Sequence, residues 1–127
     1  MAFKVAFKVN GPLFGSPSNE VKKFLVMAKE EIAKQGVNRI KQRLGQVLEN
    51  PTGRYESHVR TERQRNDFMI TDLPVVYGPW LEGTGSRNAA SRFKGYRTFR
   101  IIRQELDSEV IKITRSEVEQ LVKRLNE

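Results

Sequence analysis

The sequence predicts an α+β fold, in which a long N-terminal amphipathic helix and a C-terminal helix pack on a small antiparallel β-sheet with a projecting hairpin. Three observations favour it. Residues 2–9 alternate apolar and polar side chains, apolar residues from 21 to 48 recur every three or four positions, and two β-like runs between 54 and 73 flank a polar stretch. At 127 residues, the chain is expected to form one domain over 1–127.

The N-terminal residues are expected to form a strand followed by a flexible arm. The run "AFKVAFKV" at residues 2–9 places Phe3, Val5, Phe7 and Val9 on one face. The next stretch, "NGPLFGSPSN", is rich in glycine, proline, asparagine and serine, which disfavour regular structure. Residues 1–18 are therefore predicted to be a half-buried strand on a tether.

A long helix is predicted from about residue 20 to residue 49, with Ser18 or Asn19 as its N-cap. Such a helix would be ~45 Å long, whereas a compact domain of this size is about 36 Å across. We therefore expect the helix either to break or to overhang the body. Gly36 and Gly45 are the expected bending points, because glycine weakens a helix interior.

A hairpin over residues 54–73 is expected to follow within a core that spans 19–113. Its tip, from Glu62 to Asp67, is wholly polar and gains nothing from burial, so it is predicted to project from the body. Such a tip either contacts a partner or is simply mobile, and the sequence leaves both open.

A second helix is predicted from Phe93 to Ile113, after a glycine-rich loop at 83–95. A break and a terminal helix over 114–127 should follow, since two candidate capping boxes lie there. These are Thr114 with Glu117 and Ser116 with Glu119.

The residue types present do not point to an enzyme. There is no cysteine, and a single histidine, His58, excludes a histidine-rich zinc site, so no metal or cofactor is expected. Ser57 and His58 are neighbours on a predicted strand and point to opposite faces, so they cannot form a nucleophile and base pair. The N-terminus does not resemble a signal peptide and no stretch reaches ~20 apolar residues, so synthesis in the cytoplasm is expected.

The net charge of +8 and the isoelectric point near 10 favour acidic partners, although the charge could also serve solubility alone. Arg97, Arg100 and Arg103 recur at intervals of three, so a helix would align them for phosphate contact. No helix-turn-helix or zinc-finger pattern is present, and "GTGS" at 83–86 lacks the spacing of a phosphate-binding loop. A stand-alone basic nucleic-acid-binding protein is therefore an alternative function.

The stretch "YGPWLEGT" at residues 77–84 is the most distinctive block of the sequence. Together with Arg92, Phe93, Gly95, Tyr96, Phe99 and Arg100, it resembles the minor tail-component or tail-completion (neck) proteins of long-tailed bacteriophages (siphophages). The similarity covers roughly residues 20–110. It implies a non-enzymatic virion protein that forms a ring, usually of sixfold symmetry, between the head connector and the tail tube.

The resemblance also implies partners and a location. These are further copies of the chain in a ring, a head-side connector or stopper protein, and a tail terminator or tail tube protein. The excess positive charge could face acidic neighbouring rings or genomic DNA in the channel, which it would contact non-specifically. No membrane partner is implied, and the location is the neck of the virion.

Candidate contact residues follow from the block and from the basic side chains. Pro79 with Gly78 can start a short helical turn in which Trp80 and Leu81 dock, while Tyr77 braces the entry. This turn either buttresses a loop that faces a neighbouring subunit or plugs the domain's own core. The expected subunit-interface residues are Phe3, Val5, Phe7, Tyr77, Pro79, Trp80, Leu81, Glu82 and Thr84. The expected contacts to the channel or an acidic partner are Arg60, Arg63, Arg65, Arg87 and Arg92.

Overall fold

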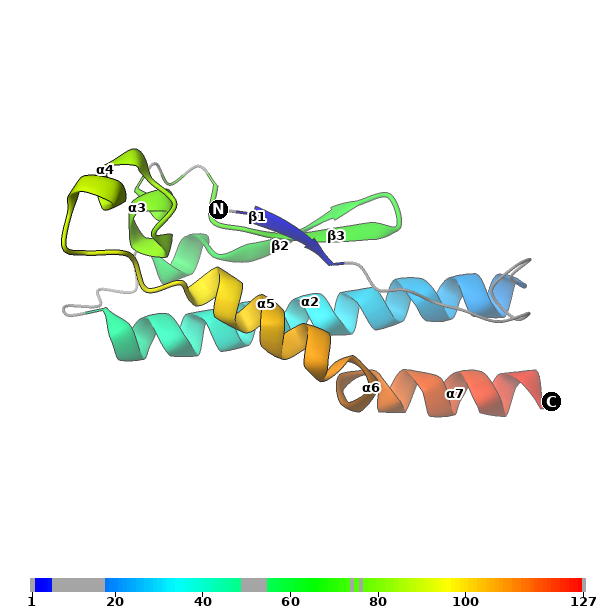
Figure 1. Cartoon of the computed structure of the whole chain (residues 1–127). Coiled ribbons are helices and arrows are strands. Elements are labelled where there is room, and N and C mark those ends of the chain that lie inside the picture. Colours follow the sequence, from blue (N-terminus) through cyan, green and yellow to red (C-terminus); the bar gives the residue numbers. More distant parts are fainter. Residues whose placement is uncertain (1, 6–17, 49–54, 74, 76, 127) are drawn as a thin grey trace.

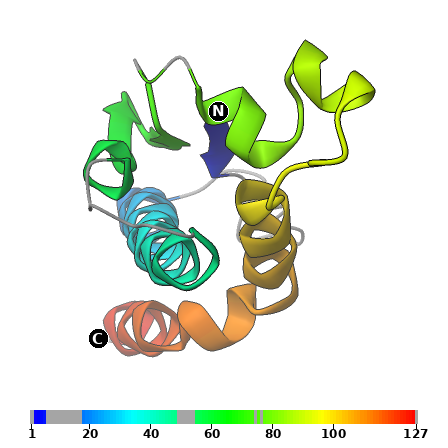
Figure 2. The ribbon, with the colours of Figure 1, turned by 90° about the vertical axis from the view of Figure 1, so that its left-hand side faces the viewer.

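A 29-residue helix, α2 (Asn19–Val47), is the central element of the structure, a computed structural model that describes residues 2–5, 18–48, 55–73, 75 and 77–126. Figure 1 shows the sheet on one side of α2, and Figure 2 shows α5 beside it and α7 on the far side from the sheet. Within the described ranges the fold is α+β, as predicted, with a three-stranded antiparallel sheet and six α-helices.

The sheet has the strand order β1-β3-β2, so the N-terminal strand lies at one edge and pairs with the last strand of the hairpin. The strands are β1 (Ala2–Val5), β2 (Arg60–Gln64) and β3 (Asp67–Thr71). Val5 lies opposite Phe68 in β1–β3, and Gln64 lies opposite Asp67 in β2–β3. The predicted strand is confirmed for residues 2–5, while Phe7, Val9 and the predicted arm lie outside the described residues.

The helix α2 does not break, and this corrects the expectation of a bend at Gly36 or Gly45. Ser18 caps it by accepting a hydrogen bond from the Val21 backbone N–H at 3.3 Å, and the helix then runs without interruption to Val47. Its N-terminal turns do not overhang either. The terminal helix α7 (Arg115–Leu125) covers them, and Leu121 packs into a cluster with Val21, Phe24 and Ala28.

Gly36 has a packing role. A Cβ atom at this position would lie 2.5 Å from Ile70 Cδ1 of β3 and 2.9 Å from Leu106 Cδ1 of α5 (Thr98–Ser108), so glycine leaves room for the ends of these two side chains against α2. The main core lies at this junction of sheet, α2 and α5. Its buried members are Val5, Ile32, Ala33, Ile40, Leu44, Tyr55, Val59, Phe68, Ile70, Phe99, Ile102 and Leu106.

The hairpin is shorter than predicted. A 3₁₀ turn, η1 (Glu56–His58), precedes β2, and the turn between the strands contains only Arg65 and Asn66, with Arg65 at a φ of 59°. These two residues are exposed. The first residue of β3 beside them, Asp67, is attached to α2, because Lys29 donates to Asp67 Oδ1 at 2.9 Å. Of the predicted tip from Glu62 to Asp67, Asp67 is therefore bound to the body of the domain, while residues 63–66 are exposed.

The second predicted helix begins five residues later than expected. Residues 93–97 are not helical, because Gly95 and Arg97 take positive φ values of 89° and 57°, and α5 starts at Thr98. After the short α6 (Val110–Ile113), the break at Thr114 and the terminal helix are confirmed. Neither predicted capping box forms there. Thr114 is the N-cap residue of α7, but its side chain accepts no hydrogen bond from the first turn of that helix, and its hydroxyl donates to the Val110 carbonyl at 2.7 Å.

Candidate functional site: a locked unit at residues 77–100

The block from Tyr77 to Thr84 forms the short helix α3 (Gly78–Glu82), which confirms the predicted turn. Pro79 occupies the first turn, where its missing N–H leaves no helical hydrogen bond unmade. Gly83 ends the helix in the left-handed conformation, at a φ of 98°. The glycines and the proline of this block are therefore needed where the chain starts and stops a single helical turn.

Glu82 connects α3 to α5. Its side chain is only 2% exposed, and its carboxylate accepts hydrogen bonds from the backbone N–H groups of Phe99 at 2.8 Å and Arg100 at 3.1 Å. The Arg100 guanidinium also binds it, with Nε 3.0 Å from Oε2, and donates to the Glu82 carbonyl at 2.6 Å. Because α5 has no N-cap side chain of its own, Glu82 supplies the acceptors that its first turn lacks.

Two glycines lie back to back beside this cap. A Cβ atom on Gly83 would lie 2.0 Å from the Lys94 carbonyl oxygen, and one on Gly95 would lie 2.2 Å from the Gly83 nitrogen. Next to them, the Tyr96 N–H donates to the Leu81 carbonyl at 2.7 Å. The two ends of the loop 83–95 are thus joined.

Asn88 holds the loop in place from inside. It lies in the short helix α4 (Ser86–Ala90) and is 3% exposed. Its Oδ1 accepts from the Gly85 N–H at 3.0 Å, and its Nδ2 donates to the carbonyls of Trp80 at 3.2 Å and Phe93 at 3.1 Å. A single buried amide therefore links α3, α4 and the segment that leads to α5, a role that sequence reasoning missed because nothing in the pattern distinguishes this asparagine from a loop residue.

The aromatic residues of the block form a half-buried chain of rings. Trp80 packs on Phe93 with ring centroids 5.0 Å apart, and Phe93 packs on Tyr96 at 4.9 Å. Tyr77 is different, because it is 45% exposed and lies against Tyr55 at 5.6 Å. The turn therefore packs internally through Trp80 and leaves Tyr77 at the surface.

A buried polar pair supports the entry to α3. The Tyr55 hydroxyl donates to Asp72 Oδ2 at 2.6 Å, and Asp72 is fully buried. Burial, together with this hydrogen bond, raises the pKa of Tyr55 well above its usual range. Gly78 lies directly over the carboxylate, since a Cβ atom there would be 2.1 Å from Asp72 Oδ2. Any side chain at position 78 would displace this pair.

The structure places the predicted interface residues in different environments. Val5 and Glu82 are buried and Phe3 is half-buried against Phe99, so these three side chains contact their own domain. Tyr77 and Thr84 are exposed, whereas Pro79, Trp80 and Leu81 are half-buried, and Phe7 lies outside the described residues. Membership of an interface remains a prediction for all of them, but the buried Glu82 carboxylate already has partners within the chain.

The predicted basic contacts also divide into two groups. Arg60 is bound to Glu62 at 2.6 Å and to the carbonyls of His58 and Leu73, and Arg63 lies over the Phe68 ring at 5.6 Å. Arg65, Arg87 and Arg92 are exposed, and their side chains make no hydrogen bond or ion pair with any described residue.

The expected helical stripe of Arg97, Arg100 and Arg103 is corrected in part, because Arg97 precedes α5. Arg100 is bound to Glu82, and Arg103 lies over the Phe3 ring, 5.8 Å from its centroid.

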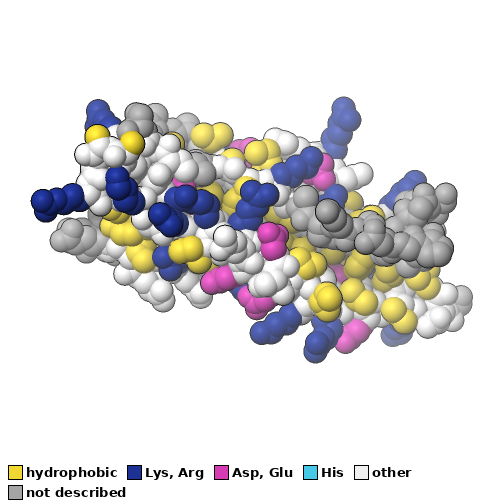
Figure 3. Space-filling view, viewed as in Figure 1, with side chains coloured by type: hydrophobic (Ala, Val, Ile, Leu, Met, Phe, Trp, Pro, Cys, Tyr) yellow, Lys and Arg dark blue, Asp and Glu magenta, His cyan; other side chains and the backbone are white. Residues whose placement is uncertain are grey.

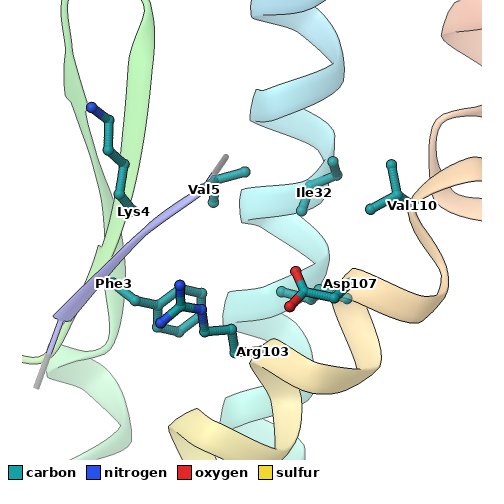
Figure 4. Close-up of a pocket in the computed structure, with 8 residues that line it drawn as sticks. Phe3, Lys4, Val5, Ile32, Arg103, Asp107 and Val110 are labelled. Carbon is teal, nitrogen blue, oxygen red and sulfur yellow. The ribbon is translucent and has the colours of Figure 1, made fainter. Parts of the chain in front are cut away.

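The cavity between β1, α2 and α5 is too small to hold a metabolite. It measures about 40 Å³, and its lining includes Phe3, Ile32, Arg103 and Asp107, which Figure 4 shows around the opening. Ligand pockets for drug-sized molecules are ten or so times larger.

Within the described ranges, no group of three or more histidine, aspartate or glutamate side chains is placed to hold a metal ion. None of the helices there is both long and apolar enough to cross a bilayer.

Comparison of the chain with protein-family models, with curated proteins and with solved structures gave no match.

Proposed function

We propose that the chain is a structural subunit of a bacteriophage virion, which forms a ring in the neck and joins the head connector to the tail tube. The proposal starts from the resemblance of residues 77–84 and 92–100 to tail-completion proteins. Its main support in the structure is that these two stretches form one hydrogen-bonded unit through Glu82 and the Gly83–Gly95 contact. The residues that carry the resemblance are thus in contact with one another in the fold.

Exposed apolar side chains give this protein surfaces that a partner would cover. Leu73, which follows β3, and Tyr77, which precedes α3, are 53% and 45% exposed. A second set follows α6 and α7, where Ile111 is 81% exposed and Val118, Val122 and Leu125 are 40–51% exposed. Contiguous apolar side chains at a surface favour protein contacts.

The sheet offers a second kind of contact. Among the strands in the described ranges, β1 and β2 lie at the two edges, and an edge strand presents backbone groups to which a neighbouring chain can add. Identical subunits that meet head to tail close into a ring, which places each such surface against a different surface of the next copy. The proposed partners are therefore further copies of the chain, a head-side connector or stopper protein, and a tail terminator or tail tube protein. The hairpin turn at Arg65 and Asn66 is available to the same partners.

The proposal is tested on virions from the genome that encodes the chain. Particles made without the protein should be separated into DNA-filled heads and finished tails, as seen by electron microscopy, and supplying the protein should restore joined particles. The purified protein alone is not decisive, because a ring subunit can stay monomeric until it meets the connector. Purified wild-type virions that lack the protein would contradict the proposal.

A further inference from the structure

The positive charge of the chain is concentrated in one segment. Between Glu82 and Glu105 there is no acidic residue, whereas six basic residues lie there: Arg87, Arg92, Lys94, Arg97, Arg100 and Arg103. They account for six of the eight excess positive charges, and the rest of the chain holds 17 basic residues against all 15 acidic ones. Charge elsewhere is thus nearly balanced.

These six side chains lie on segments that follow one another along the chain. They come from α4, from residues 91–97 and from the first turns of α5, and all six are exposed. Figure 3 shows Lys and Arg side chains gathered over the end of the molecule that carries α3 and α4 and along the beginning of α5. We call these six residues the basic surface. Arg43 of α2 adds a further cation behind it, where it donates to the Tyr96 carbonyl at 3.2 Å.

Little acidic charge offsets the basic surface. Glu82, which joins its two ends, is 2% exposed and already binds Arg100. Glu105, at the far end of the segment, contacts Arg39 of α2 at 3.5 Å. The side chains of Arg87, Arg92 and Arg97 make no hydrogen bond or ion pair with any described residue. Their charge therefore acts outward and attracts an anionic partner.

We propose that the basic surface binds the phosphate backbone of double-stranded DNA without regard to base sequence. Five of its six cations are arginines, whose planar guanidinium groups match phosphate oxygens two at a time. This binding rests on charge and exposure alone and holds whether or not the chain forms a ring.

The geometry also explains why the basic surface suits the phosphate backbone of a duplex better than unstacked bases or base edges in a groove. The rings of Trp80, Phe93 and Tyr96 pack on one another, so they offer no free platform for unstacked bases of a single strand. The helix α4 has only five residues, and the first N–H groups of α5 are already bound by the buried Glu82 carboxylate. No helix of the basic surface is therefore free to enter a groove and recognise base edges.

The first test is fluorescence anisotropy of a labelled random-sequence duplex, titrated with the purified full chain at several salt concentrations. If the basic surface neutralises three or more phosphates, the logarithm of the affinity should fall against the logarithm of salt with a slope of about −3 or steeper. Absence of binding at low salt, or binding that salt does not weaken, would overturn the proposal. Neither result bears on the neck assignment, which is tested on virions.

A matched pair of variants locates the binding surface. Arg87→Gln, Arg92→Gln and Arg97→Asn together should weaken binding at least tenfold and reduce the slope by about 3. Asparagine is chosen at 97 because it tolerates the left-handed conformation found there. The control removes the same charge elsewhere.

The control variant carries Lys23→Gln, Arg115→Gln and Lys123→Gln. These three residues are exposed and lie on the first turns of α2 and on α7, away from α4 and the beginning of α5 (Figure 1). The control should lose less than about threefold in affinity, because distant exposed charges are screened. Equal losses in the two variants would mean that net charge alone drives binding, and they would overturn the proposal. Circular dichroism and thermal unfolding confirm that each variant is folded.

Two competitors identify the class of partner. At equal concentration of negative charge, single-stranded DNA and polyglutamate should each displace the labelled duplex less effectively than unlabelled duplex does. Polyglutamate that competes as well as the duplex would assign the basic surface to an acidic protein instead. Single-stranded DNA that competes better would show that bases are contacted, and either result rejects duplex backbone as the ligand.

Discussion

Glu82 caps the first turn of α5 from 17 residues earlier in the chain, by accepting the Phe99 backbone N–H at 2.8 Å. A helix N-terminus is usually capped by a side chain directly before it, but the residue at that position here is Arg97 in a left-handed conformation, which supplies no acceptor. The start of α5 therefore depends on a tertiary contact, and α3 and α5 should form together.

Glu82→Ala should lower the free energy of unfolding by about 2–3 kcal/mol, because it leaves two backbone donors and Arg100 without their buried acceptor. Glu82→Gln keeps one acceptor oxygen and should lose less. Urea unfolding measures both. Glu119→Ala, at an exposed position of α7, is the control and should stay within about 0.5 kcal/mol of the wild type. Equal losses in the Ala and Gln variants would show that the charge alone matters.

The two glycines of α2 should respond in opposite directions to alanine. Gly45→Ala should raise stability by about 0.5–1 kcal/mol, since no atom lies within 4 Å of the added Cβ and alanine favours the helix. Gly36→Ala should lower stability despite the same propensity gain, because its Cβ meets Ile70 Cδ1 at 2.5 Å. Ile70→Val removes that carbon atom and should recover part of the loss in the double variant. A stabilising Gly36→Ala would contradict the packing role.

Gly83→Ala should destabilise by about 2 kcal/mol or more, because alanine must take a positive φ and its Cβ overlaps the Lys94 carbonyl. The loss of structure should begin around the contact between Gly83 and Gly95. Hydrogen exchange should show lost protection of the Tyr96 N–H, which donates to Leu81 at 2.7 Å. Gly85→Ala is the comparison, since φ is −74° there and the nearest atom is 3.2 Å away, and it should have a much smaller effect.

Asp67 should make stability depend on pH in the acid range. Hydrogen bonds from Lys29 and then Lys4 lower the pKa of Asp67 below its ordinary value of 3.8. A depressed pKa in the folded state stabilises the fold fully above the ordinary pKa and loses that effect as pH falls through the folded pKa. The difference in Tm between the wild type and Asp67→Asn should therefore shrink as pH falls from 7 to below about 3. A difference that stays constant would mean that the ion pairs contribute nothing.

Elements with their own local signal could be predicted from the sequence. The long helix, the strand at residues 2–5 and the turn at Pro79 were predictable because periodicity, alternation and proline act within a few residues. The start of α5 was not, since Phe93 and Tyr96 continue its apolar spacing while Gly95 and Arg97 turn the chain away from helix. The spacing of apolar residues alone does not reveal where the backbone leaves the helical conformation.

The rest of the candidate site depends on contacts distant in sequence. Gly36 looks like a weak point of a helix until Ile70 and Leu106 are placed against it, 34 and 70 residues further on. Glu82 and Asn88 look like surface residues until the segments they bind are folded around them. Polar residues that hold a loop together carry no periodic pattern, so only the structure distinguishes them from solvated ones.

The contact of Gly83 with Gly95 has a consequence for engineering. Because the two ends are joined and Asn88 binds the Phe93 carbonyl across the loop, the residues between the end of α4 and Phe93 form a short excursion between two fixed points. A short epitope tag inserted between Ala90 and Ser91, where α4 ends, should leave the Glu82 cap and the Gly83–Gly95 contact in place, and it would mark that end for an antibody in electron micrographs of whole particles.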